Sequence, residues 1–89
     1  MNRYFLVFYT YNSENKQFIG SGCNAMFTEN GRFLVLRLTM DMIASSTSAE
    51  LSKQYPLVFD DSPISVAITN ILEITATDYE TWLEKKIDE

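Results

Sequence analysis

The sequence predicts an α+β fold with a three-stranded antiparallel sheet in the order 2-1-3, one helix that crosses it and a C-terminal helix. The elements follow in the order β-β-α-β-α. The first observation is that Arg3–Tyr11 is aromatic, β-branched or aliphatic almost throughout, which is typical of a strand. The second is that neither face of this strand is polar, which indicates a central strand covered on both sides. A right-handed crossover from the second strand to the third places the first strand between them.

The first two strands are predicted to form a hairpin. The polar cluster 12–16 predicts the turn, and Gln17–Thr28 is the expected second strand. Gly20 and Gly22 lie inside that strand, where glycine marks a bulge or a close approach. We expect them to make room for an aromatic ring from the first strand.

The middle of the chain allows two interpretations. Asn30-Gly31 predicts a tight turn, because both residues tolerate positive φ. Arg32–Ile43 then fits a third meander strand by period two, or a helix by period 3.6, and periodicity alone does not choose. An apolar central strand needs a helix on its face, which favours a helix from about Val35 to Ser46. Its expected apolar stripe is Phe33, Leu36, Met40, Ile43 and Ala44.

The second half of the chain predicts a break, a strand and a helix. Ser45–Ser48 reads as a polar break, after which Ser48 caps one short helical turn that ends before Pro56. Ile64–Thr75 is the expected last strand, in which Asn70 interrupts an otherwise apolar face and, if buried, would bond to nearby backbone. That face comprises Ile64, Val66, Ile68, Asn70, Leu72 and Ile74.

The C-terminal helix is predicted from a capping box and an apolar stripe. Thr77 stands at the expected N-cap, and Glu80 follows three residues later. The stripe at helical spacing comprises Tyr79, Trp82, Leu83, Lys86 and Ile87.

Size and composition limit the classes of function. The 89 residues are expected to form a single domain, 1–89, and the 46% hydrophobic content is that of a folded chain. The net charge of −5 repels phosphate backbones, so we expect no nucleic-acid partner. No apolar run approaches the roughly 20 residues of a membrane span, and we expect a cytoplasmic protein. Cys23 is the sole cysteine, so no intrachain disulfide is possible.

One glycine pattern resembles a cofactor motif. Gly20-x-Gly22-x-x-Ala25 fits the dinucleotide-binding fingerprint, and Asp41 follows at about the right distance. Too few residues separate Ala25 from Gly31 to form the helix that would hold a pyrophosphate. We therefore expect no cofactor.

The sequence predicts no catalytic and no metal-binding residues. Cys23 has no histidine to activate it, because the chain contains none. Asp60-Asp61 with Ser62 offers oxygen ligands for a cation, but it is the ordinary composition of a solvated turn. The protein is expected not to be an enzyme, and a small carboxylate- or metal-dependent enzyme is the alternative. The carboxylate pairs that such an enzyme could use for acid–base chemistry are Glu73 with Asp78 and Glu80 with Glu84.

Four short motifs resemble a known kind of protein. They are Tyr-Phe-x-x-x-Tyr-x-Tyr at 4–11, Gly-Ser-Gly-Cys-Asn at 20–24, Asn-Gly-Arg-Phe-Leu at 30–34, and Ile-Thr-Asn-Ile-x-Glu-Ile-x-x-x-Asp-Tyr at 68–79. Together they are similar to small uncharacterised β-β-α-β proteins of phages and integrated mobile elements. The resemblance supports the helical interpretation of Leu36–Ser46. It implies no catalytic residue, since that kind of protein offers no established activity to carry over.

Aromatic residues are the best candidates for a binding surface, because Tyr and Trp are enriched in interface hot spots. The alternative is that they fill a small core. We expect a non-enzymatic accessory or protein-interaction module of a phage or mobile element, which binds a second copy or another protein. A second alternative, nucleic-acid binding, would need an exposed aromatic sheet face beside Arg3 and Arg37. The predicted interface residues are Tyr9, Tyr11, Tyr79 and Trp82.

Overall fold

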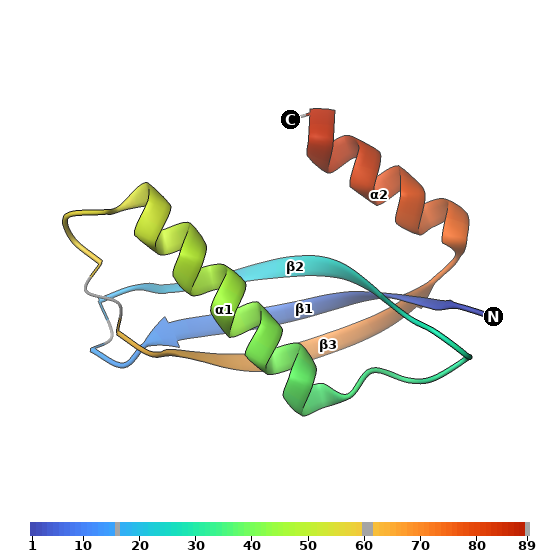
Figure 1. Cartoon of the computed structure of the whole chain (residues 1–89), viewed down its shortest axis with the longest axis horizontal. Coiled ribbons are helices and arrows are strands. Elements are labelled where there is room, and N and C mark those ends of the chain that lie inside the picture. Colours follow the sequence, from blue (N-terminus) through green and yellow to red (C-terminus); the bar gives the residue numbers. More distant parts are fainter. Residues whose placement is uncertain (16, 60–61, 89) are drawn as a thin grey trace.

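The computed structural model describes residues 1–15, 17–59 and 62–88, and side chains as far as residue 84. The described residues form a three-stranded antiparallel sheet in the order β2-β1-β3, with helices α1 and α2 (Figure 1). This confirms the predicted α+β fold, element order and strand order. The elements are β1 Arg3–Ser13, β2 Ile19–Thr28, α1 Leu36–Gln54, β3 Ile64–Ile74 and α2 Ala76–Asp88.

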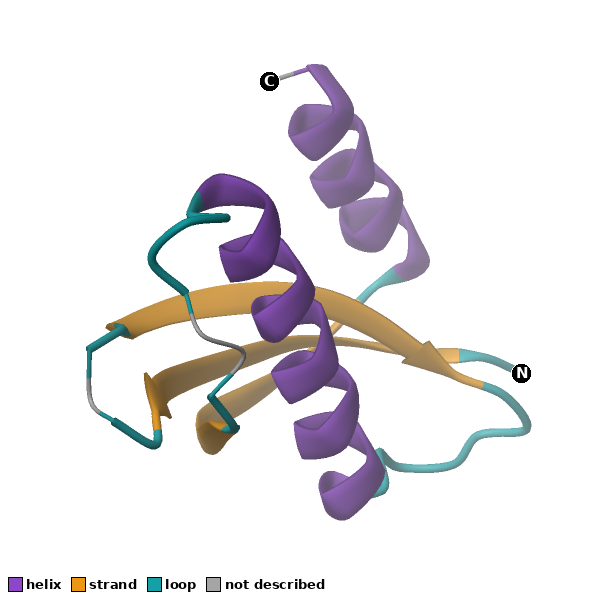
Figure 2. Cartoon of the chain, turned by 60° about the vertical axis from the view of Figure 1, so that its left-hand side comes forward, coloured by secondary structure: helices purple, strands orange, loops and turns teal. Residues whose placement is uncertain are grey.

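The molecule has two layers, and α1 lies across one face of the sheet (Figures 1 and 2). Its shortest dimension is 17 Å, which suits one helix layer on one sheet layer. Phe5 and Val7 of β1 point toward α1 and are fully buried. They form the centre of the core, together with Leu34, Ile43 and Val66.

The turn of the β1–β2 hairpin lies two residues later than expected. β1 continues to Ser13, within the predicted turn, and β2 begins only at Ile19. Ser13 is fully buried: its hydroxyl donates to Asn15 Oδ1 (2.7 Å) and accepts from the Phe18 amide (3.1 Å). Its backbone amide also donates to the Phe18 carbonyl (2.9 Å). A polar residue extends the strand here because its hydrogen-bonding groups find partners inside the protein.

The middle segment is a helix, so the strand interpretation of Arg32–Ile43 is wrong. Asn30 and Gly31 have φ values of 58° and 70°, which confirms the predicted turn. The predicted break at Ser45–Ser48 is also wrong, because α1 runs through it and ends just before Pro56 as one element. Packing of the helix on the sheet on both sides of these residues overrides their modest helix propensity.

The buried stripe of α1 differs from the predicted one. Leu36 and Met40 are 49% and 36% exposed, while Ile43 is fully buried. The residues facing the sheet are spaced strictly by four, so about one residue per turn reaches a narrow sheet. They are Thr39, Ile43, Thr47 and Leu51.

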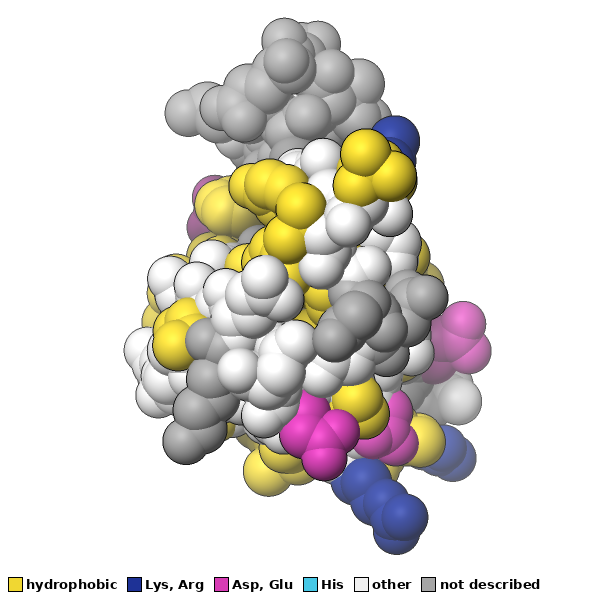
Figure 3. Space-filling model, turned by 90° about the vertical axis from the view of Figure 1, so that its left-hand side faces the viewer, with side chains coloured by type: hydrophobic (Ala, Val, Ile, Leu, Met, Phe, Trp, Pro, Cys, Tyr) yellow, Lys and Arg dark blue, Asp and Glu magenta, His cyan; other side chains and the backbone are white. Residues whose placement is uncertain are grey.

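The end of α1 is fixed to the β1–β2 hairpin by an aromatic cluster. The ring of Phe18 lies 5.4 Å from those of both Tyr55 and Phe59. The intervening Leu57 is 98% exposed. Seen from this end, hydrophobic side chains reach the surface among uncharged groups, and most of the charged side chains in view lie toward the bottom (Figure 3).

β3 contains a bulge, so the prediction that Ile64, Val66, Ile68, Asn70, Leu72 and Ile74 share one face is wrong. Opposite β1, Phe8 pairs with Asn70 but Tyr9 pairs with Ile68, so Thr69 is an extra residue. The residues before the bulge and those after it therefore exchange faces, and Ile71, not Asn70, continues the α1 side. Asn70 is exposed, and its Oδ1 accepts a hydrogen bond from the Ile71 amide (2.9 Å).

The N-cap of α2 lies two residues before the predicted one. The Asp78 amide donates to Thr75 Oγ1 (3.1 Å), so Thr75 is the N-cap residue and the Thr77 assignment is wrong. Thr77 lies within the first turn, where its carbonyl accepts from the Thr81 hydroxyl (2.9 Å). Of the predicted stripe, Tyr79 and Trp82 are half-buried; Leu83 is 38% exposed, and the side chains of Lys86 and Ile87 lie outside the described part.

Helix α2 touches the sheet only near one corner and then rises away from it (Figures 1 and 2). The Tyr79 ring lies 4.9 Å from that of Tyr4 and 6.1 Å from that of Phe27. Neither described helix has the length and apolar character needed to cross a membrane.

Candidate functional site

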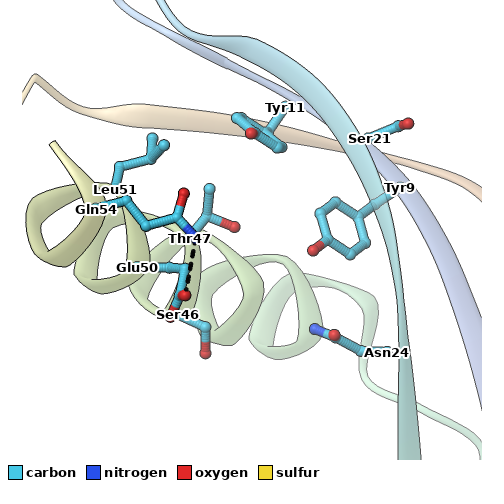
Figure 4. Close-up of a pocket in the computed structure, with 9 residues that line it drawn as sticks. All are labelled: Tyr9, Tyr11, Ser21, Asn24, Ser46, Thr47, Glu50, Leu51 and Gln54. Carbon is cyan, nitrogen blue, oxygen red and sulfur yellow. Dashed lines mark hydrogen bonds between the residues drawn. The ribbon is translucent and has the colours of Figure 1, made fainter. Parts of the chain in front are cut away.

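Tyr9 and Tyr11 line a cavity between the sheet and the second half of α1 (Figure 4). Its volume is about 470 Å³. The rings and Asn24 project from the sheet, while the facing wall comes from one side of α1. The lining residues are Tyr9, Tyr11, Ser21, Asn24, Ser46, Thr47, Glu50, Leu51 and Gln54.

The two tyrosines form the floor of this cavity because β2 has glycines opposite them. A β-carbon added to Gly22 would lie 2.5 Å from the Tyr9 hydroxyl oxygen, and one added to Gly20 would lie 2.7 Å from that of Tyr11. Both rings therefore lie over bare backbone, which confirms the prediction that these glycines make room for aromatic rings. The ring centroids are 6.4 Å apart.

The helical wall of this cavity is polar and carries one acidic group. Gln54 Nε2 donates to Glu50 Oε1 at 3.2 Å, which ties the amide to the carboxylate (Figure 4). Ser46 and Thr47 add hydroxyl groups. No lysine or arginine lines the cavity among the described residues. The arrangement suits neutral or cationic groups better than anions.

Tyr79 and Trp82 line a second, more apolar cavity between α1 and α2. Its volume is about 330 Å³. Asn24 lines both cavities, so they adjoin along β2. The four predicted interface residues therefore line two neighbouring cavities along β2, with Tyr9 and Tyr11 in one and Tyr79 and Trp82 in the other. The lining comprises Asn24, Ala25, Met26, Phe27, Leu34, Thr39, Met42, Tyr79, Trp82 and Leu83.

The sheet face opposite α1 is a third candidate surface. Helix α2 reaches it at the Tyr4–Phe27 corner, where the Tyr79 ring contacts the rings of Tyr4 and Phe27. Ile19, Phe27 and Leu72 on this face are 72%, 51% and 51% exposed. We call it the open face; its members are Tyr4, Leu6, Phe8, Thr10 and Asn12 of β1, Ile19, Ser21, Cys23, Ala25 and Phe27 of β2, and Ser65, Ala67, Asn70, Leu72 and Ile74 of β3. None of these side chains is charged.

Arg3 and Glu73 form a bidentate ion pair on the α1 side of the sheet. Arg3 Nη2 lies 2.7 Å from Glu73 Oε1, and Arg3 Nε lies 3.1 Å from Oε2. The guanidinium also stacks over Phe5 and Phe33, 5.3 and 5.6 Å from their ring centroids. The hydrogen bond from Arg3 lowers the pKa of Glu73, and the same bond raises the pKa of Arg3. Glu73 thus has a cationic partner, a contact that the sequence analysis missed because the residues are far apart in the chain.

The other sequence candidates form no recognisable reaction centre in the described part. Gly20, Gly22 and Ala25 all lie inside β2, where no helix begins beside them. The described residues contain no cluster of three metal-ligating side chains. The Asp60-Asp61 candidate lies outside the described residues.

Comparison with known proteins gives no relative from which a role could be transferred. No protein-family model, no curated protein and no solved structure matches this chain.

Proposed function

We propose that this chain is a non-enzymatic protein-interaction module that pairs with a second copy of itself through the open face. The observation that carries the proposal is a second sheet face with no charged member, which exposes Ile19, Phe27 and Leu72 while α1 covers the other face. Burying apolar surface is the main source of association free energy. A large exposed apolar patch commonly marks an interaction site.

The area of the open face suits a modest dimer. Three strands about 4.8 Å apart and about ten residues long present roughly 500 Å² per copy. Two such faces would bury about 1,000 Å² in total, close to the lower limit for a specific interface. We therefore expect a dimer that dissociates on dilution.

A second copy fits the charge pattern of this surface. The chain carries a net charge of −5, but the open face has no charged member. Two copies related by a two-fold axis can therefore pack face to face without placing like charges in contact. Aligned packing of two sheets buries such faces in ordinary β-sandwiches.

Light scattering across a range of concentrations tests the proposal. The wild-type mass should rise from the 10.3 kDa of one chain toward twice that value. Leu72→Glu places a charge on the open face and should keep the chain monomeric, because burying an unpaired carboxylate is costly. Leu57→Glu is the matched control, since Leu57 is 98% exposed and lies outside that face. A wild-type chain that stays monomeric throughout would refute the dimer.

We also propose a setting for the module, as a cytoplasmic accessory protein of a phage or an integrated mobile element. The mobile-element part depends on the motif resemblance alone, and the cytoplasmic part on the lack of a long apolar run. Sequencing the genes on either side should find integrase or phage genes. Cell fractionation should recover the protein with the cytoplasm, and recovery elsewhere would contradict the proposed location.

A further inference from the structure

We infer that the cavity floored by Tyr9 and Tyr11 binds a small organic cation, with its ammonium group over the tyrosine rings and beside the Glu50 carboxylate. The cavity lies on the α1 side of the sheet, opposite the open face. Apart from Ser21, which also belongs to the open face, the lining residues lie outside the proposed dimer surface, so each proposal can fail without the other.

The tyrosine floor has the geometry that cation–π binding requires. The two rings are tilted by 38° with centroids 6.4 Å apart, so a single ammonium group can lie within about 6 Å of both. Both side chains are half-buried, which leaves part of each ring accessible from the cavity. The glycines beneath them provide the space that the phenol groups occupy.

The charge around the cavity favours a cation over an anion. Glu50 brings a carboxylate to the wall opposite the rings, and its Oε1 is held by Gln54. The described lining offers no cationic side chain that could pair with a phosphate or carboxylate ligand. The net charge of −5 further raises the local concentration of cations.

The volume and the remaining polar groups define the class of ligand further. About 470 Å³ lies within the usual range for small-molecule sites, roughly 300–1,000 Å³. Asn24, Ser46 and Thr47 provide amide and hydroxyl groups around the rings. A hydroxylated alkylammonium compound would use both features, and choline is the simplest probe of that chemistry.

Calorimetric titration of the full chain with choline tests the inference. The matched ligand is the neutral carbon analogue of choline, which has the same shape without the charge. We expect choline to bind at least about tenfold more tightly than the analogue. Equal affinity would show a merely apolar cavity, and no binding of choline would also overturn the proposal. Glucose is the third probe, and tighter binding of glucose than of choline would point to a saccharide site and refute a cation site.

Variants then assign the affinity to this cavity. Glu50→Gln should weaken choline binding by about tenfold, while Glu29→Gln, at an exposed acid outside the lining, should leave it unchanged. Tyr9→Leu should weaken choline binding, whereas Tyr9→Phe, which keeps the aromatic ring, should bind choline about as tightly as the wild type. Leu72→Glu should bind choline with the affinity of the wild type, whether it is a monomer or a dimer. If Glu29→Gln weakens binding as much as Glu50→Gln, the cation is attracted by net charge alone and the assigned site is wrong.

Discussion

Tyr9 and Gly22 face each other across β1 and β2, and the phenol group fills the space where a β-carbon would stand. We expect Gly22→Ala to destabilise the fold by about 1–3 kcal/mol, because the added methyl group would lie 2.5 Å from the Tyr9 hydroxyl oxygen. Ser21→Ala is the control, since its side chain is exposed on the opposite face. Urea unfolding measures both. Equal stability of the two variants would mean that Tyr9 moves aside easily and that the cavity floor is not fixed.

The Arg3–Glu73 pair gives a pH-dependent contribution at the residue scale. Because the pKa of Glu73 is lower in the folded state, its stabilising effect is present above the ordinary carboxyl pKa and is lost as pH falls through the folded value. The side chains are 31% and 50% exposed, so the effect should be small. We expect Glu73→Gln to be less stable than wild type at neutral pH and nearly equal to it below the folded pKa. Urea unfolding at several pH values tests this, and a difference that persists in acid would assign another role to Glu73.

The N-terminus of α2 provides a prediction at the scale of an element. Thr75→Ala removes the hydroxyl that accepts from the Asp78 amide and should cost the helix about 1 kcal/mol. Thr77→Ala is the matched control, because Thr77 is the second residue of the same helix and its hydroxyl is not the one that accepts from the Asp78 amide. Circular dichroism during thermal unfolding compares the two variants. A larger loss with Thr77→Ala would support the cap that the sequence predicted.

The buried stripe of α1 provides a second prediction at the scale of an element. Ile43 is fully buried against the sheet, so Ile43→Ala should destabilise the fold by about 2–5 kcal/mol. Met40→Ala removes a side chain that is 36% exposed and should cost much less. Both residues belong to the stripe predicted from sequence, and only the packing separates them. Similar losses in urea unfolding would indicate that Met40 is buried in solution, for example by a partner.

At the scale of the whole molecule, a dimer formed through the open face should link stability to concentration. The melting temperature of the wild type should rise with protein concentration, because dimerisation stabilises the folded state by mass action. Leu72→Glu should melt at a temperature independent of concentration, while Leu57→Glu should follow the wild type. A concentration-independent melting temperature for the wild type would argue against the dimer by a route separate from the mass measurement.

The sequence predicted the elements better than their contacts. Arg3–Tyr11 was recognisable as a central strand because both its faces are apolar over the whole stretch. The aromatic residues of the candidate site could be named, but their division between two cavities could not be predicted. That division depends on how α1 crosses β2, which no local pattern encodes.

The sequence by itself determined the strand order, the turn at Asn30-Gly31 and the glycines beneath the tyrosines, because each follows from local propensity or backbone geometry. Only the tertiary structure decided the length and buried stripe of α1 and the faces of β3. The bulge at Thr69 shows the reason: pairing with β1 fixes the register, and one extra residue reverses every later side chain. Such choices depend on contacts between residues that are distant in the chain, so they arise only when the elements pack together.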